Sequence, residues 1–359
     1  MFKYIGSKRV FVPVLGSLAR NSGARTAVDL FTGTTRVAQE FKRSGIVTTA
    51  ADLATYSHVL AQTYIELDSE AIDQTELEDA LRYLSSLVGE AGYFTQTFCL
   101  DSRFFQPHNG ERIDAIREAI EAEFCGTDLY PVLLTSLMEA ADRVDSTTGV
   151  QMAYLKDWAP RSYNDLELKF PAMLPGTGIA LHGDATQLIH DLPETDLLYL
   201  DPPYNQHRYF TNYHIWETLV RWDKPPTYGV AHKRIDSRDQ ATKSVFNSKP
   251  RMKEAFFTLL EDARANLLLI SYNNESWITA DEMIEQLYSI GCESVVKLAF
   301  EHSRYVGARI GIHNPAGKKV GKISHTRNTE WIFVAGPASD VQQTIVGYED
   351  HRKDVPPTN

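Results

Sequence analysis

Four consecutive residues near the middle of the chain have the types and order needed for chemistry at an amine. The motif Asp201-Pro202-Pro203-Tyr204 directly follows the apolar run Leu197 to Leu200, which places it at the carboxyl end of a buried strand, where open α/β sheets bind ligands. An exocyclic base amine is a weak nucleophile because its lone pair is delocalised into the ring. The Asp201 carboxylate and the Pro202 carbonyl can accept hydrogen bonds from the two N–H groups of the amine. Tyr204 can stack on a base that has left the duplex. The motif predicts methyl transfer to such an amine; the alternative is a stiff strand terminator.

A second set of residues indicates a cofactor loop near the N-terminus. A predicted strand ends in Asp29-Leu30-Phe31, and Gly33 lies in the loop that follows, where a glycine allows the backbone to approach a ligand closely. Asp52 ends the next predicted strand, and an acid at that place can accept hydrogen bonds from both ribose hydroxyls. The loop lacks a G-x-G-x-x-G phosphate cradle. A nucleoside cofactor without phosphates, such as S-adenosyl-L-methionine, needs none.

Three further residues are candidates for holding that cofactor. Asp184 follows the third predicted strand and can accept from an adenine amino group, cap the following helix, or do both. Lys8 and Tyr4 are placed to reach the methionine end of the cofactor, where Lys8 would pair with the carboxylate.

The order of strand and helix patterns predicts one sheet domain interrupted by a long insertion. Residues 1–68 and 176–340 read as the sheet domain, residues 69–175 as a mostly helical insertion, and residues 341–359 as a tail. The predicted strands span 25–31, 46–51, 179–183, 196–200, 267–272, 295–300 and 330–335. The predicted helices span 36–43, 57–67, 76–87, 112–124, 132–144, 252–264 and 281–289. Two long loops, at 225–250 and 307–325, are read as functional, and the second is expected to join an antiparallel pair of strands.

The charge of the chain is unevenly distributed. The net charge is −11, yet residues 224–253 and residues 297–327 each carry +6. Such runs are either solvated faces or phosphate contacts, and next to a base-methylation motif we interpret them as contacts, with Lys243, Lys249 and Arg251 as candidates.

Composition also excludes several classes of protein and site. No apolar run approaches the roughly 18 residues of a membrane span, and the N-terminus is too polar for a secretory signal, so we expect a cytoplasmic protein. The three cysteines, Cys99, Cys125 and Cys292, show no C-x-x-C spacing. None of them follows a proline in a loop suited to a nucleophile, which argues against methylation of cytosine C5. The 11 histidines include no pair at metal spacing, so no metal is predicted.

The order of these motifs resembles the α-group DNA adenine-N6 methyltransferases, which include Dam-type methylases and type II modification enzymes. The resemblance rests on Phe2 to Lys8, Asp29 to Gly33, the helical insertion and the Asp201 to Tyr204 motif. It implies an α/β, Rossmann-like S-adenosylmethionine-dependent methyltransferase sheet with an inserted target recognition domain. It further implies that S-adenosyl-L-methionine is bound by the following residues: Tyr4, Lys8, Asp29, Phe31, Gly33, Asp52 and Asp184.

The implied partner is double-stranded DNA and, where the chain belongs to a restriction or defence system, a cognate restriction endonuclease. Arg103 and Asn109 lie in insertion stretches similar to those that face DNA in the family. Arg208 and Tyr209 follow the motif in a basic and aromatic loop suited to filling the gap left by a flipped base. The neighbouring Tyr213, His214 and Trp216 are read as core or pocket wall rather than as ligands.

One departure from the family concerns the cofactor loop, where Thr35 occupies the place of a second glycine. Three rival functions stay open at this point. The same tetrapeptide serves cytosine-N4 methylation and methylation of an RNA base. Thr35 is the one feature in favour of a catalytically idle DNA-binding protein, and the intact Asp201 to Tyr204 motif and Asp52 weigh against it.

Overall fold

The computed structural model describes residues 3, 4, 6, 8–203, 208–303 and 327–353. The chain divides into two compact units. The first unit contains residues 1–12, 32–184 and 207–244, and the second contains residues 13–31, 185–206 and 245–359.

The second unit contains six strands that are neighbours in the order β10-β8-β9-β7-β4-β1. Their bounds are β1 Thr26–Asp29, β4 Thr195–Leu200, β7 Ala265–Asn273, β8 Ser294–Ser303, β9 Arg327–Gly336 and β10 Arg352–Lys353. Strands β1, β4 and β7 are parallel, whereas β9, β8 and β10 join by antiparallel pairing. The antiparallel pairing of β8 with β9 confirms the sequence expectation, and the predicted joining loop at 307–325 lies outside the described residues. Leu197 to Leu200 are at most 1% exposed, so β4 is a buried strand.

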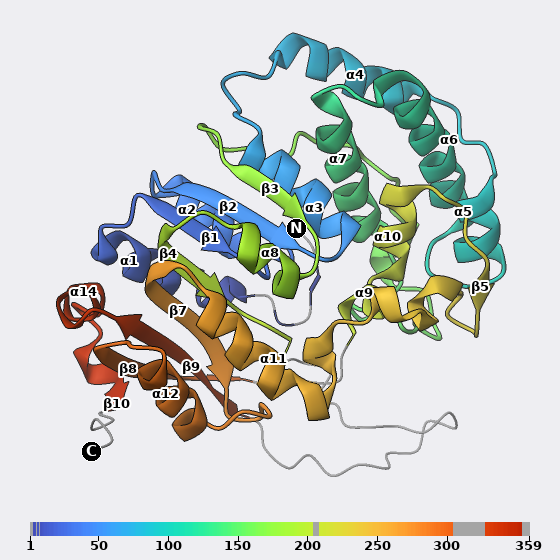
Figure 1. The fold of residues 1–359 in the computed structure, drawn as a ribbon. Coiled ribbons are helices and arrows are strands. Elements are labelled where there is room, and N and C mark those ends of the chain that lie inside the picture. The colour runs from blue at the N-terminus through green and yellow to red at the C-terminus, as the bar shows by residue number, and fades with distance from the viewer. Residues whose placement is uncertain (1–2, 5, 7, 204–207, 304–326, 354–359) are drawn as a thin grey trace. The chain divides into compact units, whose positions relative to one another are not determined.

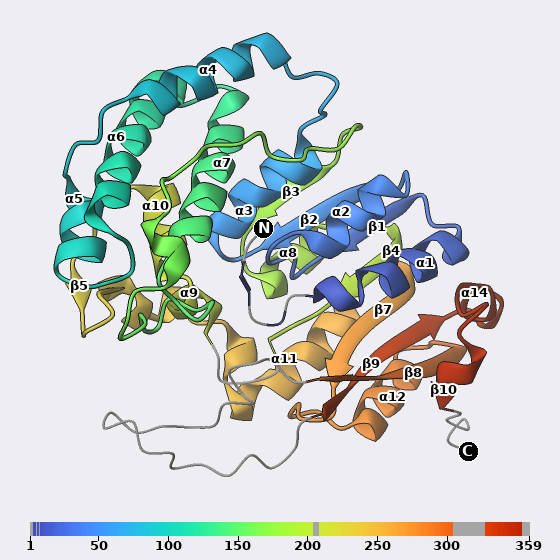
Figure 2. The same ribbon diagram turned by 180° about the vertical axis from the view of Figure 1, so that it is seen from behind.

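Helices accompany this sheet along the chain (Figures 1 and 2). Their bounds are α1 Val12–Ser22, α8 Ala185–Asp191, α11 Lys249–Asp262, α12 Ala280–Ser289 and α14 Ala338–Thr344. The α12 helix begins with a capping box in which Thr279 and Glu282 bond reciprocally. The side-chain amide of Asn21 in α1 donates to the Thr344 and Val346 carbonyls, which joins α1 to α14. Neither α1 nor α14 was predicted from the sequence pattern.

The first unit contains a parallel strand pair and the helices next to it. Strand β2 spans Val47–Asp52 and pairs with β3, Ile179–His182, so that Asp52 lies opposite His182. The predicted helix at 36–43 is found at those bounds as α2, Arg36–Arg43. Helix α3, Thr55–Ala61, continues as the π-helix η2, Gln62–Glu66. These strands and helices confirm the β-loop-α-β-acid pattern read from the sequence.

The insertion is helical, as expected, and the segment 207–244 belongs to the same unit. Its elements are α4 Gln74–Ser86, α5 Tyr93–Thr95, η3 Gln96–Leu100, α6 Pro107–Phe124, α7 Leu129–Val144, α9 Tyr209–Asn212, α10 His214–Arg221 and the hairpin β5 Thr227–Tyr228 with β6 Lys233–Arg234. Both ribbon views show α10 beside α6 and α7 (Figures 1 and 2). Phe94, Phe98, Phe104 and Phe105 form part of the core.

The remaining short helices are 3-10 turns, at η1 Lys8–Val10, η4 Pro160–Tyr163, η5 Ile235–Arg238, η6 Gln240–Thr242, η7 Val245–Asn247 and η8 Glu349–His351. Within the described ranges, every helix is too short or too polar to cross a membrane.

Thr35, the departure from the family's second glycine, adopts the conformation that glycine favours. Its φ of 59° and ψ of 12° lie in the left-handed region, which non-glycine residues rarely occupy. The side chain is fully buried, and its Oγ1 donates to the Thr34 carbonyl and accepts from Gln39 Nε2, both at 2.8 Å. The backbone geometry of a glycine is therefore retained, and hydroxyl hydrogen bonds help to stabilise it.

Substitutions at position 35 should separate backbone strain from side-chain bonding. A left-handed L-residue costs about 1–2 kcal/mol, which Thr35→Gly relieves while losing the hydroxyl bonds. Thr35→Ala loses the same bonds and keeps the strain. We expect the free energy of unfolding, measured in urea, to be about 1 kcal/mol lower for Thr35→Ala than for Thr35→Gly. Equal stability of the two variants would show that the left-handed conformation is not strained here.

Candidate active site

In the second unit, two acids lie at the same edge of the sheet. Asp29 is the last residue of β1 and is 1% exposed, and Asp201 directly follows the last residue of β4. The two strands are parallel neighbours with Asp29 opposite Tyr199, so their carboxyl ends coincide. Asp201 is half-buried and Pro202 is buried. The structure thus brings two of the predicted site residues together, whereas Tyr204 lies outside the described residues.

Phe31 lies just beyond β1 in the same unit. Its ring is half-buried and meets Phe246 edge-on, with the ring centroids 5.1 Å apart. Phe246 is 1% exposed, so this contact anchors the residues that precede α11.

In the first unit, the carboxylate of Asp52 is held by backbone N–H groups from both sides. Its Oδ2 accepts from the Gly33 N–H at 2.8 Å, and its Oδ1 accepts from the Ala54 N–H at 2.9 Å. Burial raises the pKa of Asp52, and the two N–H bonds oppose that rise. Each carboxylate oxygen has a second lone pair, so an oriented Asp52 can still accept from the hydroxyls of a ribose.

Tyr4 covers the loop that contains Gly33. A Cβ at Gly33, whose φ is +51°, would lie 3.3 Å from Tyr4 Cε1. The Tyr4 ring stacks on Tyr209 and Tyr213, at centroid distances of 5.4 and 4.5 Å, and its hydroxyl lies 3.2 Å from that of Tyr56. Burial is the largest cause of the raised pKa of Tyr4, so the phenol stays neutral. Sequence analysis assigned Tyr4 to the cofactor and Tyr209 to DNA, and the structure brings them into contact.

Lys3 anchors this N-terminal segment and was missed from the sequence. Its Nζ lies 3.2 Å from Asp142 Oδ2 and 3.2 Å from Asp145 Oδ1. Burial raises the pKa of Asp142 to about 6, and the Lys3 charge opposes that rise. No signal in the sequence links Lys3 to α7, because the partners are 139 residues apart.

Two other predicted cofactor residues lie in the same unit. Lys8 is in η1 and is 8% exposed, which is unusual for a lysine and differs from an ordinary surface position. Asp184 follows β3 and is half-buried. The neighbouring Gly183 donates its N–H to the Asp52 carbonyl at 3.0 Å, so Asp184 lies two residues beyond the register pair of Asp52 and His182.

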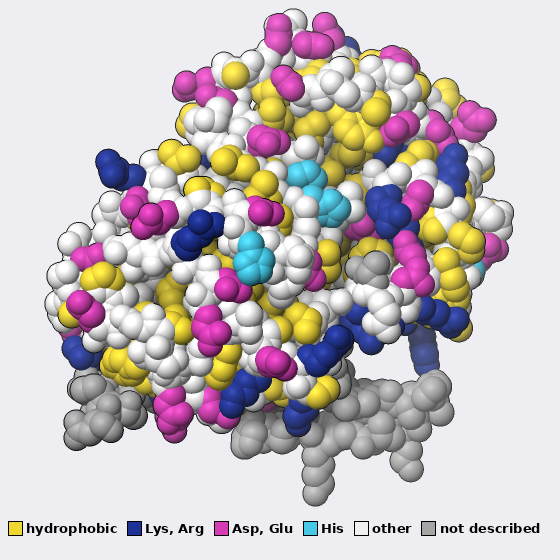
Figure 3. Space-filling view, in the orientation of Figure 1, with side chains coloured by type: hydrophobic (Ala, Val, Ile, Leu, Met, Phe, Trp, Pro, Cys, Tyr) yellow, Lys and Arg dark blue, Asp and Glu magenta, His cyan; other side chains and the backbone are white. Residues whose placement is uncertain are grey.

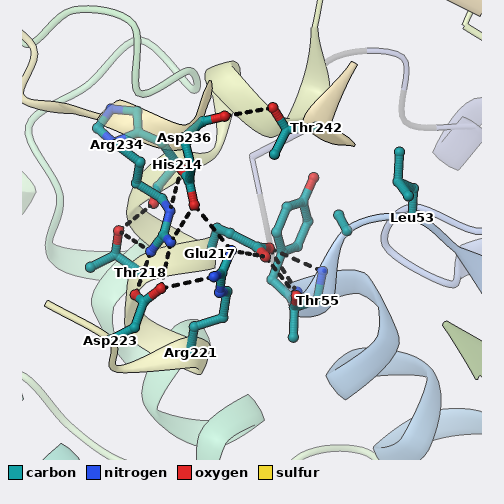
Figure 4. Close-up of polar contacts among 12 residues, drawn as sticks. Leu53, Thr55, His214, Glu217, Thr218, Arg221, Asp223, Arg234, Asp236 and Thr242 are labelled. Atoms are coloured by element: carbon teal, nitrogen blue, oxygen red, sulfur yellow. Dashed lines mark hydrogen bonds and ion pairs between the residues drawn. The ribbon is translucent and has the colours of Figure 1, made fainter. Parts of the chain in front are cut away.

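The segment 207–244 is fixed by a buried arginine (Figure 4). Arg234 is fully buried and donates to both Asp223 oxygens at 2.6 Å and to Asp236 Oδ2 at 2.7 Å. Arg221 contacts the same two acids, at 2.9 and 3.2 Å, and lies 3.9 Å from Glu217. Arg234 was counted in the basic segment 224–253, and its burial removes it from any phosphate-binding surface.

The predicted DNA-contacting residues differ in exposure. Arg208, Lys249 and Arg251 are exposed and Lys243 is half-exposed. Arg103 is half-exposed, lies 4.9 Å from the Trp158 ring centroid and donates to the Lys156 carbonyl. On the face shown in Figure 3, basic and acidic side chains are interspersed.

Asn109 requires a correction. Its side chain is fully buried and donates to the carbonyls of Ser162 and Asn164, while its oxygen accepts from the Leu166 N–H at 2.8 Å. All polar positions of the amide are used to hold the segment after η4 against α6, so Asn109 is not available for a DNA contact. The polar character of the stretch was visible in the sequence, but its burial was not.

Tyr213, His214 and Trp216 are at most 2% exposed, which confirms that they belong to the core. Over the part of the chain that the structure describes, no three His, Cys, Asp or Glu side chains are grouped to hold a metal ion.

Comparison with known proteins identifies the family. Residues 4–285 match the family described as D12 class N6 adenine-specific DNA methyltransferase. The type II methyltransferase M.NlaIII of Neisseria lactamica is 32% identical over 283 residues, which cover 76% of this chain and 82% of that protein. The modification methylase StsI of Streptococcus sanguinis is 29% identical over 314 residues, or 82% of this chain, and the matched region spans 47% of StsI. This chain therefore belongs to the D12 class N6 adenine-specific DNA methyltransferase family.

Proposed function

We propose that this chain transfers a methyl group from S-adenosyl-L-methionine to N6 of a flipped-out adenine at a specific site in duplex DNA. The observation that carries the proposal is the position of Asp201 and Pro202 at the carboxyl end of the buried parallel strand β4, in a chain of the N6 adenine-specific family. The cofactor would supply an activated methyl group with a sulfonium leaving group.

The residues after β4 would act on the amine. Asp201 and the Pro202 carbonyl accept the two N–H bonds of N6, which favours a pyramidal nitrogen whose lone pair points at the methyl group. As the new N–C bond forms and the methyl–sulfur bond breaks, positive charge would develop on N6, and the Asp201 carboxylate would stabilise that charge. The sulfur would leave as a neutral thioether, and N6 would then release one proton to solvent. Pro203 stiffens the turn, and Tyr204 stacks on the base. Catalysis then rests on proximity and placed acceptors, without a covalent enzyme intermediate.

The residues that would hold the cofactor fit a nucleoside with a zwitterionic tail. Asp52 binds the ribose hydroxyls with the lone pairs that its Gly33 and Ala54 contacts leave available. Asp184 accepts from the adenine amino group, and Lys8 pairs with the methionine carboxylate. Tyr4, held over Gly33 by its stacking partners, forms part of the wall. Asp29 and Phe31, in the second unit, are the remaining residues that the family resemblance assigns to the cofactor.

DNA binding would use exposed or half-exposed basic residues for which no carboxylate partner is found among the described residues. Lys224 and Lys253 pair with Glu118 and Glu282, at 2.5 and 2.7 Å, so they are weaker candidates than the following residues: Arg103, Arg208, Lys243, Lys249 and Arg251. Tyr209 lies next to Arg208 and would support the loop from its position on Tyr4. Because the relatives are named as type II methyltransferases and modification methylases, we propose a restriction endonuclease as the companion of this chain.

Asp201 is the most direct test of the mechanism. Asp201→Ala should abolish nearly all methyl transfer, because the amine loses its charged acceptor, while cofactor binding stays largely intact. Asp201→Asn keeps one acceptor without the charge and should be as active as Asp201→Ala or more so, and less active than the wild type. Single-turnover methylation of duplex DNA at saturating cofactor measures this order. Nucleoside mass spectrometry should identify N6-methyladenine; N4-methylcytosine, or near-normal turnover by Asp201→Ala, would contradict the proposal.

Asp52→Ala tests the ribose assignment. Loss of a charge-assisted acceptor should weaken S-adenosyl-L-methionine binding by about 1.5–3 kcal/mol, as measured by titration calorimetry. The melting temperature without cofactor should change little, because Asp52 is only partly buried and water can replace the lost carboxylate. Wild-type cofactor affinity in Asp52→Ala would rule out the assignment.

The basic residues are tested by the salt dependence of DNA binding. Replacing Lys243, Lys249 and Arg251 by glutamine should weaken binding to all sequences alike and make the slope of log K against log salt shallower by roughly 0.9 per lost phosphate contact. The control replaces Lys224 and Lys253, whose charges already have carboxylate partners, and should change the slope less. An unchanged slope in the triple variant would show that these residues do not contact phosphates.

A further inference from the structure

We infer that Glu217 is a positioning residue for cofactor binding, because its carboxylate fixes the first turn of α3, on which Asp52 and Tyr4 both depend. The inference rests on the proposed assignment of Asp52 to the ribose. Glu217 lies on α10 in the segment after the Asp201 motif, far from Asp52 in the sequence, and no motif marks it.

Helix α3 has no cap of its own. Its N-cap residue is Ala54, which makes no side-chain cap bond, so the first N–H groups of the helix need other partners. Glu217 supplies them: its Oε2 accepts from the N–H groups of Thr55 and Tyr56, at 3.0 and 3.3 Å, and its Oε1 accepts from Thr55 Oγ1 at 2.6 Å. The cap therefore comes from a residue 162 positions away.

The capped turn holds the candidate cofactor residues in place. The Ala54 N–H, next to the Thr55 N–H bound by Glu217, donates to Asp52 Oδ1. Successive backbone N–H groups thus bind two different carboxylates, so a shift of the turn would also rotate the Asp52 side chain. Tyr56 is the residue after Thr55, and its hydroxyl lies 3.2 Å from the Tyr4 hydroxyl. This contact helps to keep the Tyr4 ring over the Gly33 loop.

The burial and the partners of Glu217 are those of a carboxylate held in one position. The residue is 1% exposed, and burial raises its pKa, which the bonds from Thr55 and Tyr56 and the charge of Arg221 oppose. A serine or aspartate at position 54 would cap α3 locally. A cap from α10 instead ties the cofactor-side turn to the segment that contains the Arg234 network, as Figure 4 shows.

Asp114 provides a matched control within the same unit. Like Glu217 it is a buried acid that caps a helix in another part of the chain: it accepts from the N–H groups of Gly92, Phe94 and Thr95 and from Thr95 Oγ1, at 2.6 to 2.9 Å. None of these partners is a candidate cofactor residue. Removing its charge should therefore lower stability without moving Asp52.

The experiment compares Glu217→Ala, Glu217→Gln and Asp114→Asn in the full chain. Titration calorimetry gives the Kd for S-adenosyl-L-methionine, and thermal denaturation without cofactor gives the melting temperature. We expect Asp114→Asn to lower the melting temperature and leave Kd within about twofold of the wild type. Glu217→Ala should raise Kd roughly tenfold, comparable with the loss of a hydrogen bond to a charged group. Glu217→Gln should fall between them, because its amide oxygen can still accept from the α3 N–H groups.

A Kd for both Glu217 variants equal to that of Asp114→Asn would overturn the inference and leave Glu217 as a structural cap. If Glu217→Ala does not fold, Glu217→Gln decides the matter by the same comparison. The Asp52→Ala variant separates the ribose role of Asp52 from the positioning role of Glu217. Loss of affinity there, with wild-type affinity in the Glu217 variants, refutes the positioning role alone; wild-type affinity in Asp52→Ala refutes the ribose assignment and with it this inference.

Discussion

Buried charges at both ends of the helix that follows Asp52 are the interaction on which the candidate cofactor site depends. Glu217 binds the N-terminal N–H groups of α3. At the other end, Lys42 Nζ donates to the carbonyls of Tyr64, Ile65 and Leu67 as the π-helical turn closes, at 3.3, 2.9 and 2.7 Å. An anion at the N-terminus and a cation at the C-terminus both complement the helix dipole. Burial lowers the pKa of Lys42 to about 8, so the amine is held by its carbonyl partners rather than by water.

The same rule, that buried polar groups need partners, makes the segment 207–244 a defined body rather than a loose loop. Arg234 is fully buried, and its guanidinium donates two hydrogen bonds to Asp223 and two to Asp236. Removing one partner of such a pair leaves an uncompensated buried charge, which is strongly destabilising. The ion pairs and hydrogen bonds of Arg234 and Asp236 therefore fix the hairpin β5–β6 to α10.

What the sequence could predict follows from local rules. Strand-end acids at Asp29, Asp52 and Asp201 were found because a buried parallel strand has an apolar run followed by its first polar residue. Helix α2 was predicted at its observed bounds because a glycine, Gly45, follows its last turn. In the structure Gly45 has a φ of +81°, the left-handed conformation that ends a helix. These features depend on residues that are close together in the sequence, so they could be predicted from the sequence alone.

Apart from Arg234, whose partners Asp223 and Asp236 are 11 and 2 positions away, the features that were missed are decided by partners far away in the chain. Residue type cannot show that Arg234 and Asn109 are buried, because their burial depends on carboxylates and carbonyls that only the folded chain brings to them. The same holds for the cap that Glu217 provides and for the anchor that Lys3 forms on Asp142. A count of basic residues therefore overestimated the charge that the segment 224–253 presents to solvent.

Backbone strain in the first unit is concentrated next to these polar networks. Among the described residues, the non-glycine positions with positive φ are Thr35, Trp222, Lys224 and His232, and three of them flank or enter the hairpin. Such conformations cost of order 1–3 kcal/mol each and persist only where surrounding contacts impose them. Here Lys224 Nζ lies 5.5 Å from the Trp222 ring centroid, and His232 Nδ1 lies 3.1 Å from Thr227 Oγ1. Contacts that hold a strained hairpin in one shape before binding reduce the ordering cost of any binding in which the hairpin takes part.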